Sequence, residues 1–291
     1  MSPQSPIVVL DSGLGGLTVV RAMRTVLPQE DVVYFGDTAR LPYGSKTADT
    51  VATFVRQIIG HLQAVEPKHV VIACNTATAL ALPGVRAAFP GLSISGVIEP
   101  GAKAAVAAAG AVAAPVIGVI ATEATVRSRE YERAIHRRRA YARLFMQPTP
   151  LLVPMIEEGR RPGDPLVTLA LEQYLRPMID HGPDVLVLGC THYPLIADAI
   201  RGVVGPGVRV IDSAAECADD VARRLIGAGL LRCGPDERTG TLRCFVTDDP
   251  PRFARLGSRF LGVTIDEPTL VHPDELYGVP SAAVVPQRKV G

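Results

Sequence analysis

Short apolar runs of strand length recur along this chain, and segments with helical spacing separate them. One such segment, residues 18–27, has apolar residues three and four positions apart, which is typical of a helix with one buried face. This alternation favours β-α units and a mainly parallel sheet that helices cover on both faces. The apolar runs that we expect to form strands are rich in valine and isoleucine and lie at residues 7–10, 31–37, 69–73, 116–120, 184–189 and 208–212.

The length and composition of the chain exclude several classes of protein. Its 291 residues are enough for one large or two ordinary domains, and its net charge of +1 gives no reason to expect nucleic acid or a membrane surface as a partner. No apolar stretch reaches the roughly 20 residues that span a bilayer, and the first residues predict a strand rather than a signal peptide. Five cysteines without the spacing of a disulfide framework predict reduced thiols in the cytoplasm.

Polar side chains follow the predicted strands at the points where these strands end. In open parallel sheets, ligands bind beyond the carboxyl ends of the strands, so these residues are candidates for a functional site. Two of the strand ends carry a cysteine. The groups at the strand ends are Asp11-Ser12, Asp37-Thr38, Cys74-Asn75-Thr76, Thr122 and Cys190-Thr191-His192.

The two cysteines at strand ends occupy matching places in two similar segments. Cys74 and Cys190 each lie seven residues after a proline, and a weaker match aligns Ser12 with Thr122. One strand-turn-helix plan used twice predicts two similar α/β domains, each with a mainly parallel sheet, and an active site in the cleft between them. Chance similarity between two parallel strands of one sheet is the alternative.

We expect the chain to cross between the two domains twice, near residues 96–101 and near Asp212. Residues 1–97 and 212–271 are therefore assigned to the first domain, and residues 98–211 to a second, inserted domain. Residues 272–291 have little periodicity and contain three prolines, which predicts a loose C-terminal extension.

The thiols at the strand ends suggest a specific chemistry. Backbone N–H groups and the helix dipole favour a thiolate where a strand leads into a helix. The other interpretation, a buried structural cysteine, is the one we adopt for Cys217, Cys233 and Cys244. Two thiols on opposite sides of a small substrate suit stereoinversion, because one can remove a proton from carbon while the other delivers a proton to the opposite face. This chemistry needs no metal, and Cys190 and His192 are too close in sequence for the usual zinc patterns.

Neighbours of the thiols have groups that suit the same reaction. Asp11 and His192 can each orient or assist one thiol. The loop at Pro42–Gly44 can hold a second carboxylate with its backbone N–H groups. Structural roles remain open for each position, since Asp11 can cap a helix and His192 can be a core histidine. The neutral donors that can bind a carboxylate beside helix N-termini are Ser12, Asn75, Thr76 and Thr191.

Six stretches of the sequence resemble the glutamate racemases of the cofactor-independent aspartate/glutamate racemase superfamily. They occur in family order between residues 10 and 195 and read LDSGLGGLTV, GDTARLPYG, ACNTATAL, GVIEPG, LVPMIEEG and GCTHYPL. The resemblance implies interconversion of L- and D-glutamate without pyridoxal phosphate or metal, and a supply of D-glutamate for peptidoglycan. It also implies two α/β domains, the second inserted into the first, and a homodimer.

The resemblance assigns roles to individual residues. Cys74 and Cys190 match the two catalytic thiols, with Cys74 acting on D-glutamate and Cys190 on L-glutamate. Asp11, His192 and Glu157 match the groups that assist them. The positions that match substrate contacts are Asp11, Ser12, Tyr43, Gly44, Asn75, Thr76, Thr122, Thr191 and His192.

Other functions remain compatible with the sequence. An aspartate racemase of the same superfamily would share both cysteines, although those relatives typically have Glu soon after the second Cys-Thr, where this chain has His192-Tyr193. A thiol hydrolase or a small-ligand-binding protein would use a single cysteine, and the repeated arrangement argues against it. Some relatives are reported to bind DNA gyrase, and the sequence does not decide whether this chain has such a second partner.

Overall fold

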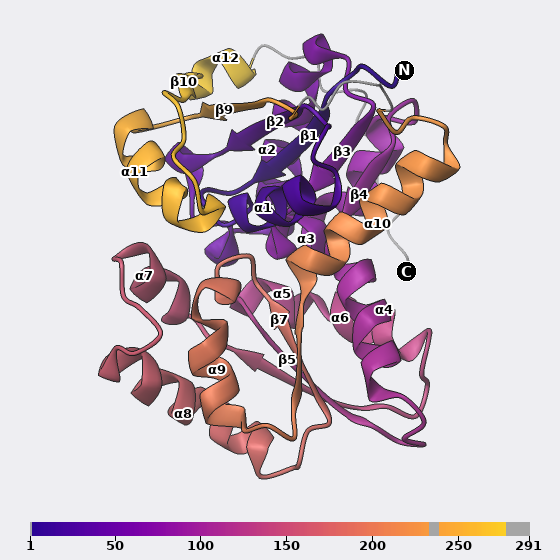
Figure 1. The fold of residues 1–291 in the computed structure, drawn as a ribbon, viewed down its shortest axis with the longest axis vertical. Helices are drawn as coiled ribbons and strands as arrows, with labels where there is room; N and C mark the ends of the chain where they lie inside the picture. The colour runs from indigo at the N-terminus through magenta and orange to yellow at the C-terminus, as the bar shows by residue number, and fades with distance from the viewer. Residues whose placement is uncertain (1, 233–238, 278–291) are drawn as a thin grey trace, which may run out of the picture.

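The structure, a computed structural model, describes residues 2–232 and 239–277, and this part of the chain contains two β-sheets. Every strand pairing in these residues is parallel. Helices lie against both faces of each sheet, so the predicted α/β class is confirmed. In Figure 1 the first sheet occupies the upper half of the molecule and the second sheet the lower half.

The first sheet is buried on both faces. Ile7 and Val9 belong to one core cluster, whereas Val8 and Leu10 belong to another, because successive side chains of a strand point to opposite faces. Burial on both faces explains the unbroken apolar run at this strand. In the described residues the sheet has six strands, in the order β10 (Thr269–Leu270), β9 (Leu242–Val246), β2 (Val32–Gly36), β1 (Ile7–Asp11), β3 (His69–Ile72) and β4 (Ile94–Gly96).

The second sheet repeats part of the first. Within the same described ranges it has four strands, in the order β6 (Arg143–Pro148), β5 (Val116–Ala121), β7 (Val185–Gly189) and β8 (Arg209–Asp212). In chain order these are its second, first, third and fourth strands, and β2-β1-β3-β4 of the first sheet have the same arrangement. Cys74 follows β3 and Cys190 follows β7, so they occupy equivalent places in different sheets. The alternative that both segments belong to one sheet is therefore wrong.

Helices cover both faces of the first sheet. The hydroxyl of Thr47 accepts the N–H of Thr50 and so caps the first turn of one of them. The helices on the Ile7 face are α1 (Leu17–Val26) and α11 (Pro250–Leu261), and those on the opposite face are α2 (Ala48–Leu62), α3 (Asn75–Ala88) and α12 (Pro273–Tyr277). Short 3-10 helices complete this part as η1 (Thr38–Arg40), η2 (Tyr43–Ser45) and η3 (Gln63–Val65).

Helices also cover both faces of the second sheet. One face carries α7 (Leu152–Glu157), α8 (Pro165–Ile179) and α9 (Ala197–Val204), and the other carries α4 (Ile98–Ala109) and α6 (Glu130–His136). The chain after β5 forms α5 (Glu123–Ser128), and the chain after β7 forms the 3-10 helix η4 (Tyr193–Ile196). Across residues 2–232 and 239–277, none of the helices has both the length and the apolar character that crossing a membrane requires.

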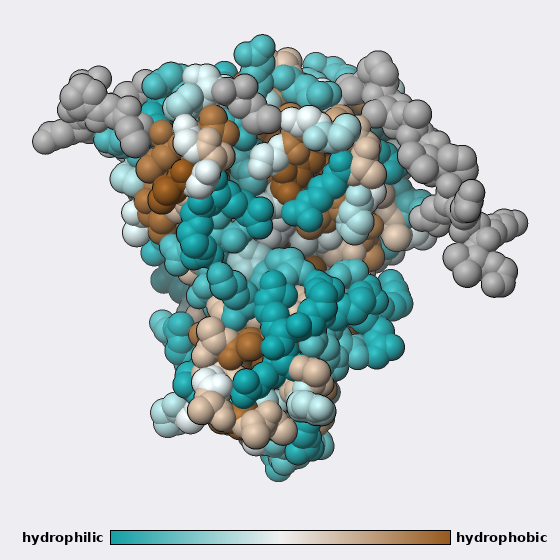
Figure 2. Space-filling model, turned by 90° about the vertical axis from the view of Figure 1, so that its right-hand side faces the viewer, coloured by the Kyte–Doolittle hydropathy of each residue, from teal (hydrophilic) through white to brown (hydrophobic). Residues whose placement is uncertain are grey.

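Two helices connect the sheets. α4 leads from β4 of the first sheet to β5 of the second, and α10 (Ser213–Gly227) leads back from β8 toward β9. These helices pack against each other, and α10 also packs against α1. Figure 2 turns this side of the molecule toward the viewer and shows hydrophilic residues across its middle. The two predicted crossings coincide with the starts of these helices. Strand β8 pairs within the second sheet up to Asp212. The domain boundaries 97/98 and 211/212 stay predictions.

The start of the predicted C-terminal extension is folded. Helix α12 packs against α2, and Leu276 is fully buried in the core of the first sheet together with Val271. Pro273 suits the first turn of a helix, and a helix of five residues is too short to give a periodic signal. The expectation of a loose segment is therefore wrong for residues 273–277. The rest of the extension, residues 278–291, and Cys233 lie outside the described residues.

The packing of α12 predicts that Leu276→Ala will lower the free energy of unfolding by about 3 kcal/mol, because truncation of a fully buried leucine leaves a cavity. Urea denaturation followed by circular dichroism measures the change. Tyr277→Ala is the matched control, since that side chain is 59% exposed, and its effect should stay within about 0.5 kcal/mol. Equal effects of the two substitutions would contradict the docked position of α12.

Candidate active site

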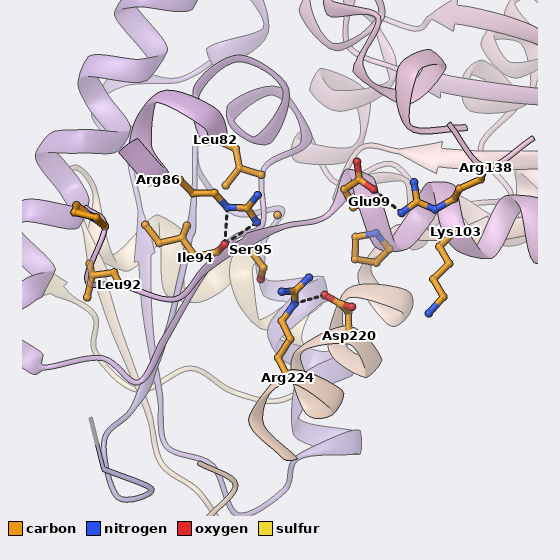
Figure 3. Close-up of a pocket in the computed structure, with 13 residues that line it drawn as sticks. Leu82, Arg86, Leu92, Ile94, Ser95, Glu99, Lys103, Arg138, Asp220 and Arg224 are labelled. Atoms are coloured by element: carbon orange, nitrogen blue, oxygen red, sulfur yellow. Dashed lines mark hydrogen bonds and ion pairs between the residues drawn. The ribbon is translucent and has the colours of Figure 1, made fainter. Parts of the chain in front are cut away.

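Two large cavities lie where the parts of the fold meet. The larger, of about 700 Å³, is formed by α3, α4 and α10 on the side shown in Figure 3. Its charged side chains are largely paired with protein groups, since Arg224 bonds to Asp220 and Arg138 to Glu99, and Arg86 donates two hydrogen bonds to a backbone carbonyl. None of the residues predicted to form the site lines this cavity. It therefore contains neither of the two thiols that the predicted chemistry needs.

The second cavity, of about 440 Å³, lies at the carboxyl ends of β1 and β3 of one sheet and β5 and β7 of the other. Its volume is within the range of small-molecule sites. Both cysteines line it, as the prediction of a cleft between the two sheets requires. The predicted site residues that it brings together are Ser12, Tyr43, Gly44, Cys74, Asn75, Thr76, Thr122, Glu157, Cys190, Thr191 and His192.

Cys74 caps the N-terminus of α3, and its sulfur accepts the N–H of Ala77 at 3.4 Å. Burial raises the pKa of the Cys74 thiol to about 12, and the negative charge of Asp11 adds to this, whereas the N–H of Ala77 and the hydroxyl of Ser12 oppose it. The sequence predicted that the helix N-terminus would favour a thiolate here. Burial outweighs that effect at Cys74, and the side chain is a protonated thiol.

Cys190 has a different partner. Its sulfur lies 3.8 Å from His192 Nδ1, and Nε2 of the same ring lies 3.0 Å from Glu157 Oε1. Burial lowers the pKa of His192, but the hydrogen bonds to Cys190 and Glu157 outweigh burial and raise it to about 10. Burial raises the pKa of Glu157, but its bond to His192 brings the net pKa below the ordinary value. A buried imidazolium therefore lies beside Cys190 at neutral pH.

Asp11 is the one predicted site residue that does not line the cavity. Its side chain is buried at the end of β1, where Oδ1 accepts the N–H of Gly13 at 3.0 Å. The other oxygen, Oδ2, is buried without a hydrogen-bond partner among the described residues. Burial raises the pKa of Asp11, while the charge of His192 and the N–H groups of Gly13 and Gly16 lower it. Any effect of Asp11 on the cavity therefore has to pass through its charge or its proton rather than through direct exposure.

The loop after β1 lies directly against the loop after β7. A Cβ atom at Gly15 would lie 2.1 Å from Thr191 Oγ1 and 2.6 Å from His192 Nδ1, so only glycine permits this approach. Thr18 Oγ1 lies 2.9 Å from the carbonyl oxygens of both Gly15 and Thr191. The glycine-rich stretch thus places the segment of the second thiol against the first sheet.

Buried side chains outside the cavity hold the loop at Tyr43 and Gly44 in place. The hydroxyl of Tyr43 donates to the carboxylate of Asp37, which Arg40 also binds at 2.8 Å. Asp37 is fully buried and does not line the cavity, so this strand-end group supports the loop. Because the hydroxyl of Tyr43 is already bound, the backbone of the loop is the part that faces a ligand.

Some lining residues were missed by sequence reasoning. Thr149 follows β6, and since the sequence does not reveal that strand, the rule that polar residues follow strand ends was never applied there. Glu123 comes directly after Thr122 at the end of β5, where the same rule would have found it. The remaining unpredicted lining residues are Gly13, Leu41, Ser45, Pro150, Val153 and Pro154, whereas Pro42 belongs to the loop predicted to hold a carboxylate.

Comparison with known proteins agrees with this geometry. The family model described as Asp/Glu/Hydantoin racemase matches residues 16–221. The chain belongs to this family. One curated relative of this racemase, glutamate racemase from Syntrophus aciditrophicus (strain SB), is 44% identical over 257 residues, which cover 88% of this chain and 93% of the relative. Glutamate racemase from Neisseria meningitidis serogroup A is 43% identical over 268 residues, which cover 92% and 97%.

A solved structure supports the same assignment. The crystal structure of glutamate racemase from Francisella tularensis subsp. tularensis SCHU S4 in complex with D-glutamate matches with a TM-score of 0.84 at 34% identity. The match covers 92% of this chain and 98% of that one. The family that the six sequence motifs predicted is thus confirmed.

The hydrogen bond between His192 and Glu157 is expected to make the stability of this racemase depend on pH. Folded His192 holds its proton more tightly than an unfolded histidine of pKa about 6.5. The resulting stabilisation is complete below about pH 6.5 and is lost as the pH rises toward about 10. Glu157→Gln should lower the pKa of His192, as measured by NMR titration of the ring nitrogens. Glu158→Gln, at a neighbouring position that is 68% exposed, should leave the midpoint unchanged; equal midpoints in all three proteins would contradict the pairing.

Proposed function

We propose that this chain is a glutamate racemase that interconverts L- and D-glutamate with two thiols and without a cofactor. The observation that carries the proposal is the single cavity that Cys74 and Cys190 both line, with a protonated thiol on one side and an imidazolium beside the other. Two thiols of unlike surroundings suit a reaction that needs one base and one acid. The names of the curated relatives support glutamate as the substrate.

In the direction from L- to D-glutamate, Cys190 acts as a thiolate and takes the proton from Cα, while Cys74 donates its own proton to the opposite face of that carbon. The bond from Cα to the first proton breaks and a bond from Cα to the second proton forms. The product therefore has the opposite configuration and the same composition. The imidazolium of His192 supplies the positive charge that the thiolate needs. Glu157 keeps that charge in place.

In the opposite direction, Cys74 must give up its proton before it can act as the base. The N–H of Ala77 and the hydroxyl of Ser12 stabilise its thiolate. Asp11, whose pKa burial raises and whose charge acts on Cys74, is suited to assist this proton transfer. The carboxylates of the substrate would be bound by the amide of Asn75, the hydroxyls near it and the backbone of the loop at Tyr43.

Further properties follow from the family resemblance and belong to the same proposal. We expect the enzyme to work in the cytoplasm as a homodimer, to supply D-glutamate for peptidoglycan, and to need neither metal nor pyridoxal phosphate. Nucleic acid and membranes are not expected partners. The two parts of the active site would belong to a domain of residues 1–97 and 212–271 and an inserted domain of residues 98–211.

The substrate assignment predicts that the enzyme, dialysed against EDTA, will racemise L-glutamate in deuterium oxide. Circular dichroism should decay to zero, and NMR should show deuterium at Cα in both enantiomers, because the incoming proton derives from a solvent-exchanged thiol. L-aspartate, offered separately, should keep its rotation. The absence of inversion of glutamate without added cofactor would reject the assignment, and inversion of aspartate alone would select the aspartate racemase alternative.

The two-thiol mechanism predicts that Cys74→Ser and Cys190→Ser will each lower the rate of racemisation by about 10²- to 10⁴-fold, since a serine hydroxyl is a far weaker acid than a thiol. Cys217→Ser is the matched control, because Cys217 lies on α10, is fully buried, and does not line the cavity. Initial rates from both enantiomers provide the measurement. Normal turnover by either strand-end variant would contradict the two-base scheme.

A further inference from the structure

The amide of Asn75 has one atom that is hydrogen-bonded and one atom that has no hydrogen-bond partner among the described residues. Asn75 is the first residue of α3, is buried, and lines the cavity beside Cys74. Its Oδ1 accepts a hydrogen bond from the hydroxyl of Tyr131 at 2.7 Å. Its Nδ2 is buried and has no hydrogen-bond partner among residues 2–232 and 239–277. A buried amide N–H without a partner is costly, so this donor is expected to serve a ligand.

Tyr131 belongs to the other half of the molecule. It lies on α6, on one face of the second sheet, whereas Asn75 begins α3 of the first sheet (Figure 1). Its side chain is fully buried in the cluster that contains Ile117 and Val187, and it does not line the cavity. Tyr131 therefore cannot touch a ligand in the cavity, and any effect on the ligand must pass through Asn75.

The hydrogen bond from Tyr131 fixes which way the amide faces. Burial raises the pKa of Tyr131 above its ordinary value, so the phenol keeps its proton and can donate it to Oδ1. With Oδ1 held against α6, Nδ2 is the amide atom left without a hydrogen-bond partner among the described residues, in a side chain that lines the cavity. The next residue, Thr76, is also tied to the second half, since its hydroxyl lies 2.8 Å from Thr122 Oγ1 and 3.3 Å from Thr125 Oγ1. These threonines fix the start of α3, which leaves the amide orientation to Tyr131.

We propose that Tyr131 is a positioning residue that holds Asn75 so that Nδ2 donates to the carboxylate on the reacting carbon of the substrate. The carboxylate attached to Cα is the one in question, because Asn75 directly follows Cys74, which reacts at that carbon. The inference rests on the proposed racemase function. It adds that a buried tyrosine beside the second sheet controls how tightly the substrate binds to an amide beside the first sheet.

The test is Tyr131→Phe, which removes the donor and keeps the ring. KM for both L- and D-glutamate should rise about tenfold while kcat changes less than about threefold, because the loss concerns a bond to a charged group in the bound substrate. The ratio kcat/KM should fall equally for the two enantiomers, since their equilibrium constant is fixed at one. If Tyr131 served only to stabilise the fold, the variant would have a lower melting temperature, or a smaller active fraction and therefore a lower apparent kcat. KM would stay unchanged.

Two further variants separate the possible causes. In an Asn75→Ala background, Tyr131→Phe should add no further increase in KM, because the group through which it acts is gone. Tyr174→Phe is the matched control. Its phenol accepts a long hydrogen bond from Leu151 N–H and lies on α8, on the opposite face of the second sheet from Tyr131, so KM should stay normal. An unchanged KM in Tyr131→Phe, or an undiminished effect in the Asn75→Ala background, would overturn the proposal. Failure of the wild-type enzyme to racemise glutamate would instead overturn the proposed function.

Discussion

The close approach of two loops, one after β1 and one after β7, is the constraint on which the active-site geometry depends. A side chain at Gly15 would overlap with Thr191 and His192, so the bare backbone lets the first loop lie against the second. Thr18 then fixes the contact, because its hydroxyl reaches a carbonyl oxygen in each loop. Two parallel sheets would each have polar strand ends without this contact. The contact turns those two edges into one cavity.

The repeated framework gives its two thiols different surroundings. The residue two places after the cysteine is Thr76 in the first segment and His192 in the second. Only the second segment therefore has a ring that can carry a positive charge beside the sulfur, and Glu157 of α7 holds that charge. On the other side, burial and the charge of a neighbouring carboxylate keep Cys74 protonated. In the proposed mechanism, this difference at one position makes an acid and a base from the same functional group.

The sequence predicted the residues that line the cavity better than the residues that hold them in place. Strands buried on both faces read as unbroken apolar runs, and the polar groups after them reach the cavity, as at Thr122. The strand β6 escaped prediction because its sequence, RLFMQP, has no valine or isoleucine, unlike the runs that were predicted as strands, and Thr149 was missed with it. Asp11 looked like a lining residue, although it lies behind the surface, since a motif does not separate residues that touch a ligand from residues that hold them. Tyr131 gave no signal, because its partner lies 56 positions away.

Because L- and D-glutamate are mirror images of equal free energy, the proposed reaction must run equally well in both directions, and this places a condition on the buried charges. At neutral pH Cys74 is protonated and an imidazolium lies beside Cys190, an arrangement that suits L-glutamate. After one inversion Cys190 carries the proton and Cys74 has lost its own, which suits D-glutamate. Continued turnover of one enantiomer therefore requires a proton to return to Cys74. In the proposed mechanism this is the task of Asp11 and His192, which act electrostatically on Cys74 and Cys190 respectively and both have raised pKa values.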